Sequence, residues 1–234
     1  MARKIYRHMR YLILFFVATA FVACQSESAQ EVPMYADFFV RYLETEEQIK
    51  AHASFYEGDT LTTSKSVTFD DEVTFQNNVM QPRQIMENRN FRYVYNGKGD
   101  YSDTFTFKFP KSAGFGKRAY TVAMAPIEDF SVKNGVVSLS EGMVLEIQGE
   151  PFQANESLVL LFTGEHNVSV AAEFEGPFDV AELDVPAVQL LGVEPGKNAL
   201  YLVKKQVNAD KADNMDVTSS VEFYSKIIDV EVVE

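Results

Sequence analysis

Apolar and polar residues alternate with a period of two along most of the chain after residue 33. Because successive side chains of a β-strand point to opposite faces, this alternation predicts strands that bury one face. We therefore expect an all-β protein made of many short strands. The alternating runs are residues 49–55, 91–95, 105–109, 143–147, 158–162, 168–174, 200–203 and 221–233.

Turn-forming residues separate these apolar runs. Asn96-Gly97 supplies the positive φ angles of a type I′ turn and predicts a hairpin between residues 91–95 and 105–109. Residues 194–197, with the sequence Glu-Pro-Gly-Lys, fit a type II turn with Gly at its third position. Many short strands divided by such turns are typical of an antiparallel β-sandwich.

The last apolar run changes phase. Val221 and Phe223 occupy odd-numbered positions, whereas Ile228 and Val230 occupy even-numbered ones. A shift of one residue in a period-two pattern indicates a β-bulge or a strand that crosses between sheets. We expect the last strand to bend within residues 225–228.

The apolar pattern is interrupted near the midpoint of the chain, where Pro126 precedes the acidic pair Glu128-Asp129. An immunoglobulin-like sandwich needs about 100 residues, so this interruption favours two such domains in tandem. We expect them at residues 34–127 and 128–234. One large sandwich over the same residues is the alternative.

The first 23 residues have a different pattern. Four basic residues within residues 3–10 precede the apolar run 12–23, which is the arrangement of a signal peptide. A helix of that apolar run would be roughly 18 Å long at 1.5 Å per residue, shorter than the roughly 30 Å hydrocarbon core of a bilayer. A cleaved signal peptide is therefore favoured over a permanent transmembrane segment.

The apolar run ends in Phe21-Val22-Ala23-Cys24, which resembles the lipobox of bacterial lipoproteins. The resemblance implies that a diacylglyceryl group is attached to Cys24 and that signal peptidase II cuts before it. Each buried CH₂ contributes about 0.8 kcal/mol of membrane affinity, so two or more acyl chains would tether the protein permanently. An ordinary secretory signal that happens to end at a Cys is the alternative.

The residues after Cys24 bear on location. Residues 24–33 are mostly polar and are expected to form a flexible tether. Gln25 directly after Cys24 implies, by the same resemblance, anchoring in the bacterial outer membrane. Glu27 and Glu31 resemble the acidic surface-export signal of Bacteroidota-type lipoproteins, so the periplasmic and the surface face both stay open. In such envelope lipoproteins, tandem immunoglobulin-like sandwiches of unassigned role are common.

Composition and charge exclude some functions. The chain of 234 residues carries a formal net charge of −13. Loss of residues 1–23, with four basic residues and no acidic ones, moves this charge to −17. Since nucleic-acid binding depends on basic residues that neutralise phosphates, we expect no nucleic-acid partner. Cys24 is the only Cys, so the chain has no intramolecular disulfide and no Cys-based metal site.

Catalytic and metal-binding motifs are absent from the sequence. It contains no GxSxG nucleophile motif, no phosphate-binding loop and no HExxH motif. His52 and His166 lie in different halves of the chain and lack metal-ligand spacing. We therefore expect no enzymatic activity, no catalytic residue, no metal and no cofactor.

Two groups of oxygen-bearing side chains are candidate sites. The acids of residues 70–72 could serve a two-acid hydrolase, but they fit a polar turn. The second group fails the EF-hand pattern and is expected to be a solvated loop, although calcium binding stays open. It comprises Asn208, Asp210, Asp213, Asn214 and Asp216.

The sequence thus predicts a lipid-anchored, non-catalytic β-sandwich protein of the cell envelope. Its expected partners are the membrane, through the anchor on Cys24, and an envelope protein or glycan that it binds or scaffolds. One alternative is a carboxylate-based hydrolase acting on glycans, with two acids in a cleft. Another is a structural subunit of an outer-membrane complex, with an apolar patch or an uncovered edge strand.

Overall fold

Three β-sheets make up the regular structure of the computed structural model, which describes residues 33–234 except 59–62, 86–89, 112–115, 167–168 and 213–214. Two short 3₁₀ helices, η1 (Lys133–Gly135) and η2 (Ala187–Leu190), lie between strands. No helix in this described part of the chain is long and apolar enough to cross a membrane. The predicted all-β sandwich is confirmed.

The large sheet has eleven strands, with the central order β11-β18-β16-β17-β1-β2-β7-β6. In addition, β13 pairs with β16 and β14, and β3 pairs with β2. The strands are β1 (Met34–Leu43), β2 (Gln48–Glu57), β3 (Lys65–Ser66), β6 (Gln81–Ile85), β7 (Asn90–Lys98), β11 (Val136–Ser138), β13 (Glu156–Thr163), β14 (Ser169–Glu175), β16 (Gly196–Ala212), β17 (Met215–Tyr224) and β18 (Ile228–Val233).

Two smaller sheets complete the fold. One has four strands in the order β5-β4-β8-β9, and the other has three strands in the order β10-β12-β15. Their strands are β4 (Thr74–Phe75), β5 (Asn78–Val79), β8 (Thr104–Pro110), β9 (Lys117–Ala123), β10 (Ile127–Val132), β12 (Met143–Gly149) and β15 (Leu183–Val185).

Aromatic rings fill the space between the large sheet and the four-stranded sheet. The ring of Phe38 on β1 lies 4.6 Å from that of Phe107 and 5.7 Å from that of Phe109, both on β8. It also stacks on Tyr120 of β9, with 4.9 Å between ring centroids. Aromatic pairs at such distances contribute packing energy beyond the area that they bury, so this layer holds the two sheets face to face.

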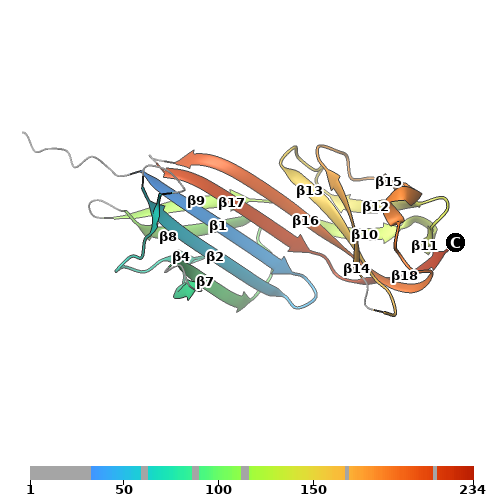
Figure 1. Cartoon of the computed structure of the whole chain (residues 1–234), viewed down its shortest axis with the longest axis horizontal. Helices are drawn as coiled ribbons and strands as arrows, with labels where there is room; N and C mark the ends of the chain where they lie inside the picture. The colour runs from blue at the N-terminus through green and yellow to red at the C-terminus, as the bar shows by residue number, and fades with distance from the viewer. Residues whose placement is uncertain (1–32, 59–62, 86–89, 112–115, 167–168, 213–214) are drawn as a thin grey trace, which may run out of the picture. The chain divides into compact units, whose positions relative to one another are not determined.

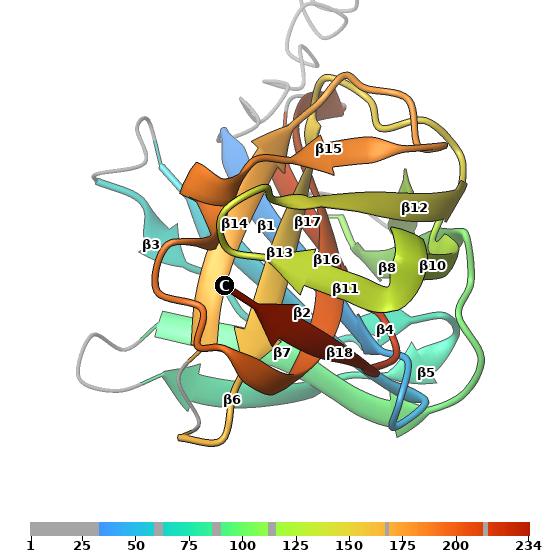
Figure 2. The same cartoon turned by 90° about the vertical axis from the view of Figure 1, so that its right-hand side faces the viewer.

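A second layer of apolar side chains lies between the three-stranded sheet and the strands β13 and β16. Figure 2 shows β12 and β15 in front of these two strands. The alternate residues for which the sequence predicted a buried face are buried, both in the three-stranded sheet and in β13 and β16. They include Leu145 and Ile147 of β12, Leu158, Leu160 and Phe162 of β13, and Leu200 and Leu202 of β16.

Strands from both halves of the chain share the large sheet. β1 pairs in parallel with β17 over its whole length, and β17 pairs with β16 (Figure 1). The expected ranges 34–127 and 128–234 therefore do not correspond to separate sheets, and the described residues form one compact unit. The expected signal peptide (1–23) and, apart from Pro33, the expected tether (24–33) lie outside the described residues.

The predicted hairpin at Asn96-Gly97 is wrong. Strand β7 continues through both residues, because Asn96 and Gly97 pair with Lys50 and Ile49 of β2. Gly97 also leaves room for Tyr95, because a Cβ atom at position 97 would overlap the hydroxyl group of Tyr95 and displace its ring. An Asn-Gly pair permits a tight turn, but pairing with a long neighbouring strand overrides this local preference.

The predicted bend near residue 225 is a β-bulge. Both β17 and β18 pair with β16, and three residues, 225–227, lie opposite only two, 201–202. The Ser225 hydroxyl oxygen accepts a hydrogen bond of 2.9 Å from the Leu202 amide. The Leu202 amide therefore keeps a hydrogen-bond partner at the bulge. The extra residue moves the buried face from odd to even positions, as the phase change predicted.

A buried ion pair joins β13 to the middle of β16. The ammonium group of Lys204 lies 3.2 Å from a carboxylate oxygen of Glu156, and their side chains are 1% and 3% exposed. The ammonium group also lies 4.6 Å from the ring centroid of Phe152. Glu156 accepts a further hydrogen bond from the Gln153 amide at 2.9 Å. Each charge therefore depends on the other for its neutralisation.

Replacement of Lys204 by Met is expected to lower the free energy of unfolding by about 3 kcal/mol, because it leaves the carboxylate of Glu156 buried without its cation. Urea unfolding followed by circular dichroism measures the change. The neighbouring substitution Lys205→Met is the control, since Lys205 is partly exposed and lies 3.9 Å from Glu173; it should cost less than about 1 kcal/mol. Equal stability of Lys204→Met and the wild type would contradict this account.

Candidate functional site

The predicted lipidation residue, Cys24, lies outside the described residues, so its modification stays a prediction. Among the described residues, no three or more His, Cys, Asp and Glu side chains come together in a group that could hold a metal ion. The remaining candidates are individual side chains, the cavities and the surfaces of the sheets.

The two histidines occupy separate places. His166 lies in the turn between β13 and β14, where its Nδ1 atom is 2.9 Å from a carboxylate oxygen of Glu194. This hydrogen bond and the negative charge of Glu194 raise the pKa of His166. His52 lies on β2, and its ring stacks on that of Phe39 with 5.5 Å between centroids. The structure thus gives each His a structural partner.

The oxygen-rich group at residues 208–216 is not a loop over most of its length. Asn208 and Asp210 belong to β16 and Asp216 to β17, whereas residues 213–214 lie outside the described part. Asp210 accepts a hydrogen bond of 2.6 Å from the Tyr120 hydroxyl group. This bond and, above all, burial raise the pKa of Tyr120 to about 12. Residues 70–72 form an exposed bend, as expected for a polar turn.

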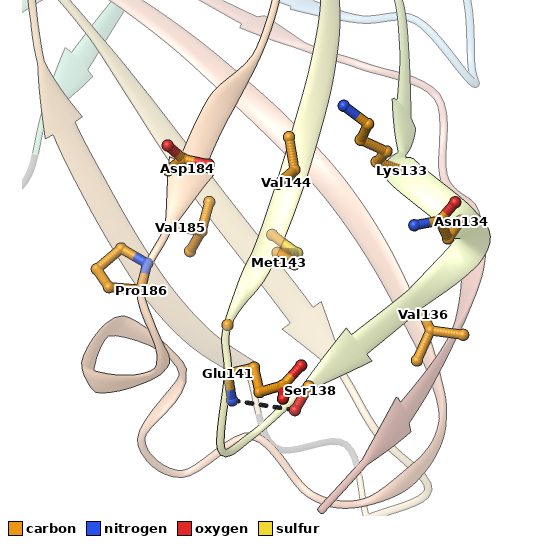
Figure 3. A pocket seen from close by; sticks show the side chains of 11 residues that line it. Lys133, Asn134, Val136, Ser138, Glu141, Met143, Val144, Asp184, Val185 and Pro186 are labelled. Carbon is orange, nitrogen blue, oxygen red and sulfur yellow. Dashed lines mark hydrogen bonds between the residues drawn. The ribbon is translucent and has the colours of Figure 1, made fainter.

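A cavity of about 530 Å³ opens where β10 leads through η1 into β11 (Figure 3). Two of its polar side chains are engaged in local structure. The Ser138 hydroxyl oxygen accepts a hydrogen bond of 3.0 Å from the Glu141 amide in the β11–β12 turn. Lys133 donates a hydrogen bond of 2.6 Å to Glu182. None of the described residues that line this cavity is aromatic.

A groove of about 430 Å³ lies on the outer face of the large sheet, which we define as the face that carries Tyr35, Asp37, Phe39 and Arg41 of β1. The buried residues of β1 point the other way, toward the aromatic core. We call this depression the tyrosine groove. It is lined by Tyr35, Asp37, Tyr56, Lys211, Asp216 and Thr218.

Strand register explains how these residues meet. Tyr35 lies opposite Tyr56 of β2 on one side and Asp216 of β17 on the other. Asp37 accepts a hydrogen bond of 2.9 Å from the Thr218 hydroxyl group. The ammonium group of Lys211 lies 3.7 Å from Asp216. Two phenol rings therefore line the groove beside polar groups that are held in place by their neighbours.

Cationic side chains continue from the tyrosine groove across the same face. Arg41 pairs with Glu222 at 2.7 Å and lies 5.3 Å from the ring centroid of Phe39. Strand register places Arg41 opposite Lys50, and Arg92 opposite Arg83. We call this set the basic stripe. It comprises Arg41 (β1), Lys50 and His52 (β2), Arg92 (β7) and Arg83 (β6).

His52 lies in the middle of the basic stripe. Its pKa is lowered by partial burial and by the positive charges of Arg92 and Arg41, against a smaller opposing effect of Asp37. Sequence analysis gave only the lack of metal-ligand spacing at His52. It could not identify the stripe, because the cations come from four strands whose order in the sheet no local pattern reveals.

No protein-family model matches the chain, and no curated protein matches it either.

Acidification is expected to destabilise the protein partly through His52. Because its folded-state pKa lies below the usual 6.5, the unfolded chain binds this proton more readily, and stability falls as the pH drops below about 6.5. His52→Gln should therefore lose less stability between about pH 7 and pH 5 than the wild type. The urea midpoint at the two pH values measures this.

His166→Gln provides a control of opposite sign. The raised pKa of His166 means that its pairing with Glu194 stabilises the fold below about pH 6.5 and is lost as the pH rises through the folded-state pKa. Its removal should enlarge the loss of stability on acidification. The same acid sensitivity in His52→Gln as in the wild type would contradict the assignment.

Proposed function

We propose that the protein is a lipid-anchored, non-catalytic protein of the bacterial outer membrane that binds a glycan through the outer face of its large sheet. The observation that carries the proposal is the tyrosine groove, which is lined by the side chains of Tyr35 and Tyr56 from opposite positions on β1 and β2. Ligand sites commonly combine aromatic side chains with a few well-placed polar groups. Phenol rings suit the apolar faces of sugar rings, and the adjoining carboxylates and hydroxyl group suit sugar hydroxyls.

The hydrogen bonding of the groove supports binding over hydrolysis. A glycosidase needs one carboxyl group as acid and a second as nucleophile or base. In the groove, Asp37 accepts a hydrogen bond from the Thr218 hydroxyl group, and Asp216 lies beside the Lys211 ammonium group. Carboxylates held in this way are suited to accepting hydrogen bonds from a ligand.

The location rests on the sequence at the N-terminus. The lipobox resemblance at Phe21-Val22-Ala23-Cys24 supports attachment of acyl chains to Cys24, and Gln25 supports the outer membrane. A protein tethered in this way would hold its sheet face close to envelope polysaccharides. The groove and the anchor thus support one role, which is retention of a glycan at the envelope.

Replacement of Tyr56 by Ala is expected to weaken glycan binding about tenfold, because it removes one of the two rings of the groove. The measurement is binding of the full-length protein in detergent to polysaccharide extracted from bacterial envelopes. Tyr201→Ala is the matched control, since Tyr201 lies on β16 outside the groove and stacks on Tyr224. If the wild type retains no polysaccharide, or if both variants bind as it does, the groove is not the site.

Replacement of Cys24 by Ala is expected to abolish lipidation, because no other thiol is present in the chain. The protein should then remain as unprocessed precursor or be released from membranes. Detergent-phase partition and mass spectrometry of the N-terminus measure the result. A processed Cys24→Ala protein that still partitions into detergent would overturn the anchor.

A further inference from the structure

We infer that the glycan is an acidic polysaccharide, whose anionic groups are bound by the basic stripe beside the tyrosine groove. This inference rests on the proposed function and names the ligand class. The two features are continuous, since Asp37 of the groove is two residues from Phe39 on β1, whose ring contacts both His52 and Arg41.

The pairing of the strands brings like charges together. Arg41 lies directly opposite Lys50, and Arg83 lies directly opposite Arg92. Like charges in such positions destabilise a sheet. Glu222 neutralises Arg41, but Lys50, Arg83 and Arg92 have no ion pair within the described part of the chain. Anions bound between these cations would relieve the repulsion.

Arg92 is only partly exposed. Its Nε atom is buried and has no hydrogen-bond partner among the described residues, so this atom is also out of reach of a ligand. A ligand carboxylate or sulfate beside the exposed part of the side chain would neutralise the charge of Arg92.

The net charge of −13 does not prevent local binding of an anion. At physiological ionic strength the Debye length is about 8 Å, so acidic side chains elsewhere on the molecule are screened. The stripe itself contains four permanent cations and His52. A chain that is acidic overall therefore concentrates positive charge on one area of one sheet face.

The extent of the stripe indicates a polymer. From Arg41 to Arg83 it crosses three strand spacings of about 4.8 Å and about four residues of 3.4 Å each along the strands, which gives a diagonal of roughly 20 Å. A single small anion cannot contact cations along this whole distance. A chain of charged sugar units can do so.

Other occupants fit the surface less well. Binding to a membrane surface requires exposed apolar side chains that enter the acyl boundary, and a protein interface usually has an apolar core. Among the described residues, none of the exposed large apolar side chains belongs to the stripe or the groove. They are Val79, Val136, Val188, Leu191, Val207, Ile227 and Val233.

The test compares two double variants of the full-length protein in detergent. Lys50→Gln with Arg83→Gln removes two charges from the stripe, and Lys111→Gln with Lys197→Gln removes two exposed charges elsewhere. The probes are polygalacturonate, neutral dextran and vesicles that contain phosphatidylglycerol. Thermal unfolding of each variant checks that it is folded.

The wild type should bind polygalacturonate and release it as the salt concentration rises. The stripe variant should bind about tenfold more weakly, and the control variant should bind as the wild type does. Equal affinity of the two variants would overturn the inference. So would binding to the vesicles alone, which would assign the stripe to a membrane surface.

The design separates this inference from the proposed function. Binding of dextran that Tyr56→Ala weakens, without any preference for polygalacturonate, would keep a glycan site in the groove and refute the role of the stripe. Failure to bind any polysaccharide, including the envelope extract, would refute both.

Discussion

Strand β16 is the element on which the rest of the structure depends. Its seventeen residues pair with β18 and then β17 along one edge and with β13 along the other. Through β17 it positions β1, and through β13 it supports the side of the core that faces the three-stranded sheet. One continuous strand therefore fixes the register of strands from both halves of the chain.

The middle of β16 contains a buried charge. At the point where pairing with β17 overlaps pairing with β13, Lys204 occupies an inward position and is neutralised by Glu156. A buried charge is tolerated only when a partner and further hydrogen bonds compensate for its lost hydration. The strand passes through this position without a break because the compensation comes from the neighbouring strand.

The same pairing creates the surface that we assign to glycan binding. Tyr35 and Asp37 on β1 meet Asp216 and Thr218 on β17 only because the first and the penultimate strands lie side by side. Since the aromatic core occupies the inner face of these strands, their outer residues are left partly or fully exposed. A sheet with one packed face and one solvated face thus offers a broad surface on which side chains from distant segments come together.

Local patterns were sufficient to predict part of this structure. The alternation of apolar residues predicted the all-β sandwich, and the phase change after Phe223 predicted the bulge at Ser225. Both features depend on which side chains a strand buries, and the period of apolar residues in the sequence indicates these side chains. The lipobox resemblance at Cys24 is equally local, and it stays a prediction because it lies outside the described residues.

Only the tertiary structure decided which strands are neighbours. The run 200–203 was expected to end before Lys204, and Asn96-Gly97 was expected to turn; both segments continue as strands because a partner strand pairs with them. The tyrosine groove and the basic stripe depend on the same choice of partners. Pairing is selected by the combined hydrogen bonding and packing of segments far apart in the chain, so no local period of the sequence contains it.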